Sequence, residues 1–200
     1  MVDIKIDGDQ LQDIQYRLGL FRSKAPDILA RAINSAAAKA RKTIIKQVTE
    51  KYEVDPAALR KTIHAKRAKP SKPSGQVSVV GGRIPLSKFK TDPLVPMGNK
   101  PEYYSAALKK ADGMKPILGD DAHSKGFLVR MSGGSVQFVE RIKGKKAKGT
   151  GKEALEALKG LSFPEMTGQR DVSKVIQEEA YRQLHTYIDK QIKKVMEGKA

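Results

Sequence analysis

The sequence has no cysteine, no tryptophan and no long apolar run, and these gaps exclude several classes of protein. Without cysteine, neither a disulfide framework nor a thiolate metal site is possible. No run approaches the roughly 20 apolar residues that a membrane helix requires, so no contact with a membrane is expected. Residues 1–8 mix acids with bases and lack the apolar segment of a signal peptide, so we expect folding in a reducing cytoplasm.

Aromatic residues are also scarce, at 6% of the 200 residues, whereas hydrophobic residues reach 39%. That composition predicts one domain, with or without extended arms, and a small core. Basic residues outnumber acids, because 39 Lys and Arg against 22 Asp and Glu give a formal charge of +17. Excess positive charge attracts polyanions, so an anionic partner is expected, and nucleic acid is the commonest of these.

Helical periodicity dominates both ends of the chain. The spacing of apolar residues predicts helices over residues 9–21, 26–52 and 171–197, after a short strand at residues 2–6. Asp55 before Pro56 is typical of a helix start and predicts a short helix over residues 57–65. The stripe of the second helix consists of Leu29, Ile33, Ala36 or Ala37, Ala40, Ile44, Val48 and Tyr52. That of the last helix consists of Val172, Ile176, Ala180, Leu184, Ile188, Ile192 and Val195 or Met196.

An alanine-rich patch lies within the second helix, at Ala36, Ala37 and Ala40. Small side chains allow another helix or a neighbouring subunit to approach closely, although ordinary helix propensity explains the alanines equally well. We predict these three residues as subunit contacts, together with Tyr103 and Tyr104.

The middle of the chain changes to short β-type runs. Residues 127–129 and 136–142 flank Ser132-Gly-Gly-Ser135, whose glycines suit a tight turn, so a β-hairpin is predicted. A further strand is predicted over residues 76–80. Residues 83–89 are predicted to form an edge strand, because Pro85 cannot donate a backbone hydrogen bond within a sheet. Residues 91–124 hold four prolines and no periodicity, which predicts a mobile loop or one that a partner orders, with a helical turn near Tyr104.

These elements predict an α+β fold, with a small antiparallel sheet or partial barrel that contains the hairpin. Long N- and C-terminal helices pack around the sheet, and an extended irregular loop completes the chain. We expect a single domain over residues 1–200, composed of a helical part (1–65), a β-rich part (76–166) with the irregular loop (91–124), and the C-terminal helix (171–197).

Two basic runs are the candidate contacts to DNA or to an acidic partner. The first is interrupted by prolines and is either a solvated linker or an arm that contacts phosphate. The second is a glycine-rich tip, where lysines act as orientation-tolerant point charges. The first run contains Lys66, Arg67, Lys69 and Lys72, and the second Lys143, Lys145, Lys146 and Lys148.

No motif indicates catalysis. Residues 144–152 approach a phosphate-binding loop, but Thr150 occupies the place where the Walker pattern demands lysine. Asp120, Asp121 and His123 lack the spacing that would fix the geometry of a metal site. No triad, zinc-finger spacing or recognition helix is present either. We therefore expect no enzyme, no cofactor, no metal and no base-specific reading of DNA.

Several short motifs follow one another in order along the chain. After the long Ala/Lys helix come Leu59-Arg-Lys-Thr-Ile63, Arg83-Ile-Pro-Leu86, Gly126-Phe-Leu-Val-Arg-Met131 and Leu158-Lys-Gly-Leu-Ser-Phe-Pro-Glu-Met166, and then a basic C-terminal helix. This order resembles the prophage minor tail protein Z family, from about residue 25 to residue 194. The chain departs from it at Ser124-Lys125-Gly126, where members often carry Pro-Gly-Ala, and at Gly160-Leu161-Ser162, where Gly-Pro-Ser is expected.

The resemblance implies a structural tail-completion protein of a phage or prophage-derived particle, assembled in the host bacterial cytoplasm and located in the virion tail or neck. Such proteins act at the head-proximal end, between the tail tube with its terminator and the head-neck connector, next to the DNA channel. The resemblance also implies a homo-oligomer, as a hexameric ring with the sixfold symmetry of the tail. Closing such a ring requires head-to-tail contacts between subunits. The alternative is an independent, sequence-nonspecific nucleic-acid-binding protein that uses both basic runs as phosphate clamps.

Overall fold

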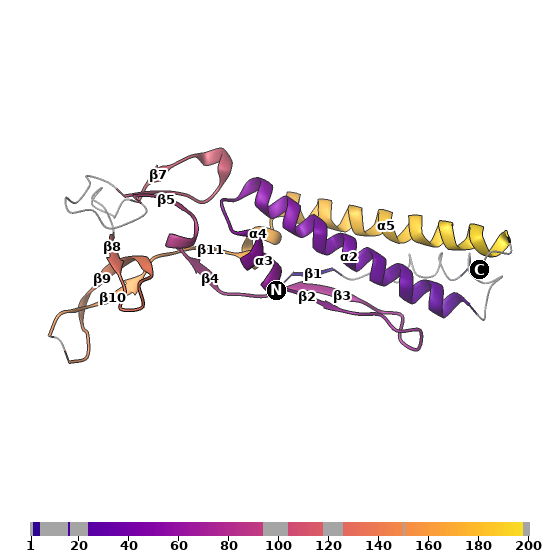
Figure 1. Cartoon of the computed structure of the whole chain (residues 1–200), viewed down its shortest axis with the longest axis horizontal. Helices are drawn as coiled ribbons and strands as arrows, with labels where there is room; N and C mark the ends of the chain where they lie inside the picture. Colours follow the sequence, from indigo (N-terminus) through magenta and orange to yellow (C-terminus); the bar gives the residue numbers. More distant parts are fainter. Residues whose placement is uncertain are drawn as a thin grey trace. The chain divides into compact units, whose positions relative to one another are not determined.

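Contacts divide the chain into two units in its computed structural model, and each unit is described by itself (Figure 1). The first comprises Met1–Val48, Leu59–Gly81 and Pro164–Ala200, and the second Thr49–Ala58 and Gly82–Phe163. The structure describes residues 2–4, 16, 24–93, 104–117, 126–149 and 151–197. The helix predicted over residues 9–21 therefore lies outside the described residues, apart from Tyr16. The expectation of one tail-completion domain stays a prediction.

Two long helices, α2 (Ala25–Lys51) and α5 (Arg170–Met196), form the core of the first unit. They run antiparallel, since Gln183 bonds to Ser35 at 2.9 Å while Glu179, four residues earlier, pairs with Lys39, four residues later. Their predicted stripes are buried at Leu29, Ile33, Ala36, Ala40, Ile44, Val48, Val172, Ile176, Ala180, Leu184 and Ile188. Both helix predictions are thus confirmed, and each buried Val, Leu or Ile side chain contributes about 1.5–3 kcal/mol.

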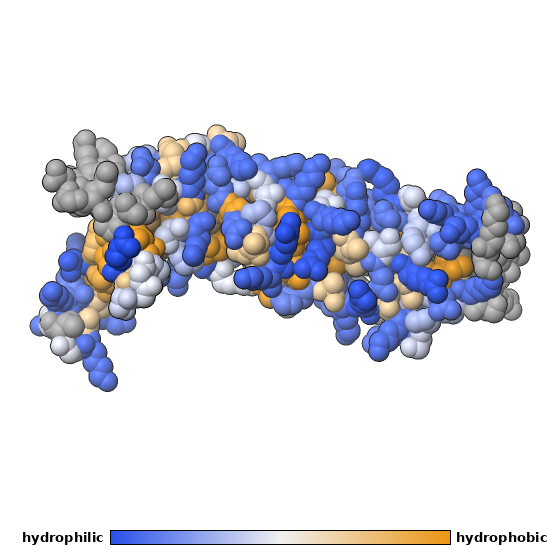
Figure 2. Space-filling model, in the orientation of Figure 1, coloured by the Kyte–Doolittle hydropathy of each residue, from blue (hydrophilic) through white to orange (hydrophobic). Residues whose placement is uncertain are grey.

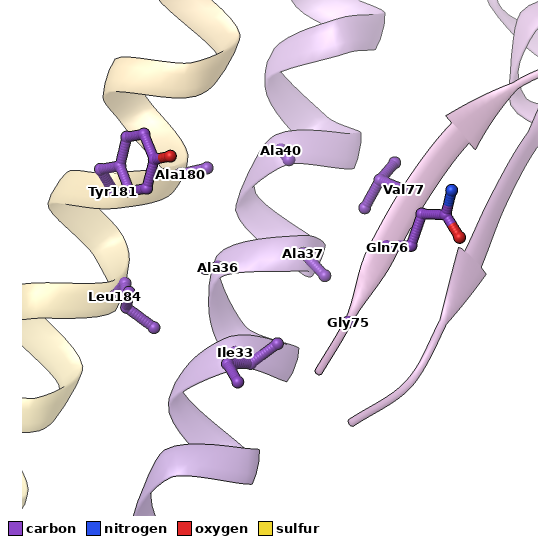
Figure 3. Close-up of a pocket in the computed structure, with 10 residues that line it drawn as sticks. All are labelled: Ile33, Ala36, Ala37, Ala40, Gly75, Gln76, Val77, Ala180, Tyr181 and Leu184. Carbon is purple, nitrogen blue, oxygen red and sulfur yellow. The ribbon is translucent and has the colours of Figure 1, made fainter. Parts of the chain in front are cut away.

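A three-stranded antiparallel sheet belongs to the same unit, in the order β1 (Val2–Ile4), β3 (Gln76–Val79), β2 (Ile63–Lys66). Val77 and Val79 are buried, two positions apart on the central strand, as the alternation of a strand requires. Figure 3 shows the Val77 side chain pointing toward α2. The predicted strand over residues 76–80 is confirmed, and the N-terminal strand is confirmed over residues 2–4.

Helix α3 (Pro56–Thr62) begins where Asp55 predicts. The two carboxylate oxygens of Asp55 accept hydrogen bonds from the backbone N–H groups of Ala57 and Ala58, at 2.8 and 3.2 Å. The predicted helix over residues 57–65 is wrong at its end, because β2 begins at Ile63, which is buried and pairs with Val79. Pairing with β3 prevails over the local helical pattern there.

The predicted hairpin is confirmed in the second unit as β8 (Phe127–Arg130) and β9 (Val136–Lys146). Gly134 has the positive φ of +79° that the turn requires. Phe138 is buried and meets the ring of Tyr104 edge-on, with centroids 5.5 Å apart. On the other face of the strand, the guanidinium of Arg141 lies 5.2 Å from the Phe127 ring centroid.

A strand that the sequence pattern did not predict, β10 (Glu153–Ala157), pairs antiparallel with β9. The sheet order is therefore β10-β9-β8. Strand β10 reads Glu-Ala-Leu-Glu-Ala, a composition with good helix propensity and no β-branched residue. The pairing with β9 decides its conformation, and it turns the predicted hairpin into a three-stranded sheet.

Short strands replace the irregular structure expected before this sheet. Strand β4 (Arg83–Pro85) pairs with β11 (Lys159–Ser162), and a 3-10 helix, η2 (Leu86–Lys88), follows β4, so the edge strand predicted over residues 83–89 is wrong beyond Pro85. Strands β5 (Lys90–Asp92), β6 (Ser105–Ala107) and β7 (Lys115–Pro116) form another sheet, with the 3-10 helix η3 (Lys110–Asp112) before β7.

The loop prediction over residues 91–124 is thus corrected where the structure describes it. The helical turn expected near Tyr104 is wrong as well, because β6 buries Ala106 and Ala107 between β5 and β7. Residues 94–103 and 118–125 of this stretch lie outside the described residues. A short helix, α4 (Phe163–Thr167), precedes α5.

The fold class is α+β, as predicted. Long helices accompany several small antiparallel sheets, and none of the sheets in the described part of the chain closes into a barrel. Figure 2 shows hydrophilic residues over most of the visible face.

Candidate interaction surfaces

The first basic run forms the connection between β2 and β3, and residues 66–75 are called the arm from here on. Seven residues, from Lys66 to Lys72, hold four cations and no acid. All four cationic side chains are exposed, and among the described residues none of them forms an ion pair. The charge of the arm is therefore directed at solvent or at a partner rather than neutralised by a carboxylate of the described residues.

Packing and hydrogen bonds dock the arm on α2. The side-chain amide of Asn34 bonds twice to Ala68, donating to its carbonyl and accepting from its N–H, both at 3.0 Å. Ala68 itself is buried in the helical core. Gly75 is needed because a Cβ there would lie 2.5 Å from Cγ2 of Ile33. Docking fixes part of the arm's backbone, but its cations stay exposed, so both predicted alternatives, a solvated segment and an arm that contacts phosphate, remain predictions.

The end of the arm is a tight turn. Lys69 and Lys72 exchange both backbone hydrogen bonds, at 3.1 and 2.9 Å, and enclose Pro70 and Ser71. Residues that exchange both bonds stand directly opposite each other, with their side chains on the same face of the ladder. Two exposed lysines thus share one face at the end of the arm.

The second basic run spans the end of β9 and its connection to β10, and residues 143–152 are called the tip. Lys143, Lys145, Lys146 and Lys148 are exposed, and none forms an ion pair with a described carboxylate. Gly144, Gly149 and Gly151 have positive φ, and a Cβ at any of them would meet nothing within 4 Å. The tip therefore carries its charge at the end of a strand and the turn that follows, with open space around its glycines.

Lys146 of the tip differs from the lysines at the end of the arm in its cross-strand neighbour. Its register partner is Glu153, an acid. The arm belongs to the first unit and the tip to the second.

The alanine patch packs inside the first unit. Ala36 and Ala40 are buried, and with Ala37 they line an apolar cavity of about 30 Å³ between α2, the start of β3 and α5 (Figure 3). Its other lining residues are Ile33, Gly75, Gln76, Val77, Ala180, Tyr181 and Leu184. That volume suits about one water molecule, and the lining is apolar, so the cavity is a packing space rather than a ligand site.

The predicted subunit contacts are therefore corrected in part. The close approach that small side chains allow is made by α5 of the same chain, which buries Ala36 and Ala40. Tyr104 is buried against Phe138 and is equally internal. Ala37 is half-buried and stays a predicted contact, and Tyr103 lies outside the described residues.

One ion pair ties α2 to α5 electrostatically. Nζ of Lys39 lies 2.9 Å from Oε2 of Glu179, and Nη1 of Arg182 lies 2.7 Å from Oε1. The hydrogen bond from Lys39 holds the pKa of Glu179 below its usual value; partial desolvation opposes this shift, and the charge of Arg182 favours it. The pair orients the two helices rather than forming a reactive site.

A metal site and a membrane-spanning helix each have requirements that the described residues do not meet. No cluster of three His, Cys, Asp or Glu suitable for a metal occurs among them, and Asp120, Asp121 and His123 lie outside them. Within the same residues, no helix has the length and apolar character that crossing a membrane requires.

A model of one protein family covers nearly the whole chain. The family described as Prophage minor tail protein Z (GPZ) matches residues 12–199. The chain belongs to this family. The resemblance drawn from the ordered motifs is thereby confirmed. No curated protein and no solved structure matches the chain.

Membership of the minor tail protein Z family indicates a structural protein of the phage tail, located in the virion and in contact with other tail components. The family is not known for catalysis, in agreement with the lack of a catalytic motif. Its membership does not by itself give the arm or the tip a partner.

Sequence reasoning found the cations of both surfaces but not the contacts that shape them. Asn34 was overlooked because a lone polar residue on a helix gives no signal of a tertiary bond 34 positions away. The turn that places Lys69 opposite Lys72 could have been predicted, since Pro-Ser between two lysines is a turn pattern. No sequence pattern indicated strand β10, because its residues favour a helix.

Proposed function

We propose that this chain is a tail-completion subunit that acts at the head-proximal end of the phage tail. There it joins the tail tube and its terminator to the head-neck connector, next to the channel through which DNA passes. The observation that carries the proposal is the family match over residues 12–199. The two basic surfaces support it, since cations beside a DNA channel neutralise phosphates without reading sequence.

Copies of the chain associate into a ring that shares the sixfold symmetry of the tail. A ring requires heterologous contacts, in which one surface of a subunit meets a different surface of the next. Strand β10 supports such a contact, because it lies at the edge of its sheet among the described residues and exposes Leu155. Assembly takes place in the host bacterial cytoplasm, where the tail is built.

The tip contacts either packaged DNA at the lumen of the ring or an acidic surface of a neighbouring subunit. Four exposed charges lie at the end of β9 and just beyond it, on Lys143, Lys145, Lys146 and Lys148. Reversing all four charges should abolish DNA retention or assembly, and particles that form and retain DNA normally with the reversed tip would exclude both contacts.

The function is tested on particles produced without the protein. Electron microscopy should show complete heads and tails that fail to join, or joined particles whose DNA is misplaced, and supplying the wild-type chain should restore them. Normal heads, tails and joining in its absence would contradict the proposal. A phage tail in which only the adsorption end is defective would place the protein elsewhere in the tail.

The alternative, an independent nucleic-acid-binding protein, has support in the exposed cations of the arm and the tip. The two functions differ in what the purified chain associates with. Light scattering at two salt concentrations should give the mass of a ring, or of a complex formed with tail or neck proteins. A monomer that ignores those proteins and binds short duplex DNA would favour the alternative.

A further inference from the structure

The end of the arm holds two like charges in an unfavourable arrangement. Lys69 and Lys72 face each other across a two-residue turn, so their Cβ atoms are about 4.5–5.5 Å apart. Like charges directly opposite on paired strands destabilise the pairing. Among the described residues no carboxylate pairs with either ammonium group, so nothing there offsets the repulsion.

The backbone of the arm is fixed by tertiary contacts on both sides of its exposed turn. Asn34 fixes both backbone groups of Ala68, which directly precedes Lys69. On the returning side, Gly75 presses on Ile33 so closely that no Cβ fits. The backbone on both sides of the turn is therefore fixed, and the two lysines are presented before any ligand arrives. Such preorganisation lowers the entropy lost on binding.

We propose that the arm is a preformed phosphate clasp, in which Lys69 and Lys72 together hold one phosphate of a DNA backbone. This inference rests on the proposed function, which places the chain beside DNA. A phosphate between the two ammonium groups converts their repulsion into two attractive contacts. The non-bridging oxygens of the phosphate accept hydrogen bonds from both lysines.

The neighbouring charges favour a polyphosphate chain over an isolated carboxylate on a protein. Lys66 and Arg67 continue the positive charge along the arm, and no acid interrupts it. A ligand that carries successive anions along its length matches such a run, and the backbone of nucleic acid has this character. The clasp recognises phosphate and has no means of reading bases.

The slope of log K against log salt counts the phosphates that the clasp neutralises. Binding of the full-length chain to a short duplex of random sequence is measured at several salt concentrations for Lys69→Ser, Lys72→Ser and the double variant. If both lysines hold one phosphate, each single variant keeps nearly the wild-type slope, and the double variant lowers its magnitude by about 0.9. If each lysine contacts its own phosphate, each single variant should instead lower the magnitude of the slope by about 0.9 and the double variant by about 1.8. That result would contradict the binding of one phosphate by both lysines.

A matched double variant separates the clasp from net charge. Lys88 and Lys110 are exposed and lie outside both basic surfaces, so Lys88→Ser with Lys110→Ser removes the same charge. This control should leave the slope within about 0.3 of the wild-type value, below the change expected for one phosphate. An equal effect of the two double variants, or no effect of Lys69→Ser with Lys72→Ser, would overturn the clasp.

Asn34 is a positioning residue in this account, because it acts through the backbone of Ala68. Asn34→Ala leaves the charge unchanged but releases the arm, and it should weaken DNA binding at least threefold. Ser35→Ala is the control, because Ser35 bonds to Gln183 and not to the arm. Wild-type DNA affinity in a folded Asn34→Ala chain would contradict preorganisation.

Failure of the clasp and failure of the proposed function give different results. A chain that restores particle assembly but shows no slope change in the double variant lacks the clasp and keeps the function. A chain with the predicted slopes whose absence leaves particles normal has the clasp and lacks the function. If the double variant binds DNA normally but no longer binds a tail protein, the arm contacts an acidic protein partner and the clasp is overturned.

Discussion

The arm and the tip are both rich in basic residues but differ in how their backbones are held. Both include a turn between antiparallel strands, and both carry four exposed predicted contact cations. The arm is docked by Asn34 and by the fit of Gly75 on Ile33, whereas the glycines of the tip have open space around them. At the end of the arm two lysines face each other, while Lys146 of the tip faces Glu153. Charge alone does not therefore distinguish a docked surface from an undocked one; packing does.

The largest expected difference between the two surfaces comes from the core residue beneath the arm. Ile33 is 2% exposed and meets Gly75, so Ile33→Ala should lower the free energy of unfolding by about 2–5 kcal/mol. Lys145→Ala at the tip should change it by less than about 0.5 kcal/mol, since the side chain is exposed. Denaturant unfolding of both variants measures this. Equal losses would contradict the burial of Ile33 in the core beneath Gly75.

A smaller loss of stability is expected when a methyl group is added where the arm packs closely on α2. Gly75→Ala should cost about 1–3 kcal/mol, because the new Cβ requires Ile33 to shift in a packed core. Gly133→Ala, in the turn between β8 and β9, is the matched control, since a Cβ there meets nothing within 4 Å and should change stability little. Thermal unfolding compares the two, and a neutral Gly75→Ala would refute the close fit.

Replacing one of the facing lysines should stabilise the free protein. Lys72→Glu turns a repulsive cross-strand pair into an attractive one and should raise stability by about 0.2–1 kcal/mol, or up to about 4 °C in Tm. Lys148→Glu changes the net charge equally at the tip, where no cross-strand lysine is relieved, and should give a smaller rise. The stabilised variant should also bind DNA more weakly than the wild-type chain. An equal rise in both variants would assign the effect to net charge alone.

The smallest effect concerns pH and the ion pair between α2 and α5. Because the pKa of Glu179 is lowered on folding, its contribution is present above the unfolded pKa and is lost as pH falls through the folded value. Glu179→Gln should therefore lower Tm at pH 7 and lower it progressively less as the pH falls and the carboxyl of Glu179 is protonated in the folded state. In a Lys39→Gln background the same substitution should matter less at pH 7. A pH-independent difference would mean that the pair does not contribute through its charge.

The sequence predicted the parts of the fold that local periodicity determines. The stripes of α2 and α5, the cap at Asp55 and the turn between β8 and β9 all follow from residues within a few positions of one another. Strands β10 and β6 did not follow, because their conformation depends on pairing with distant strands. For the same reason the cations of the arm were found, but not their docking through Asn34.

The location of the subunit in the particle tests the central claim most directly. A short peptide tag inserted at Gly133, in an open turn, is labelled with gold and viewed by electron microscopy in particles that carry no untagged copy. The account predicts label at the head-proximal end of the tail, at the junction with the neck. Label at the adsorption end, or along the tail tube, would contradict it.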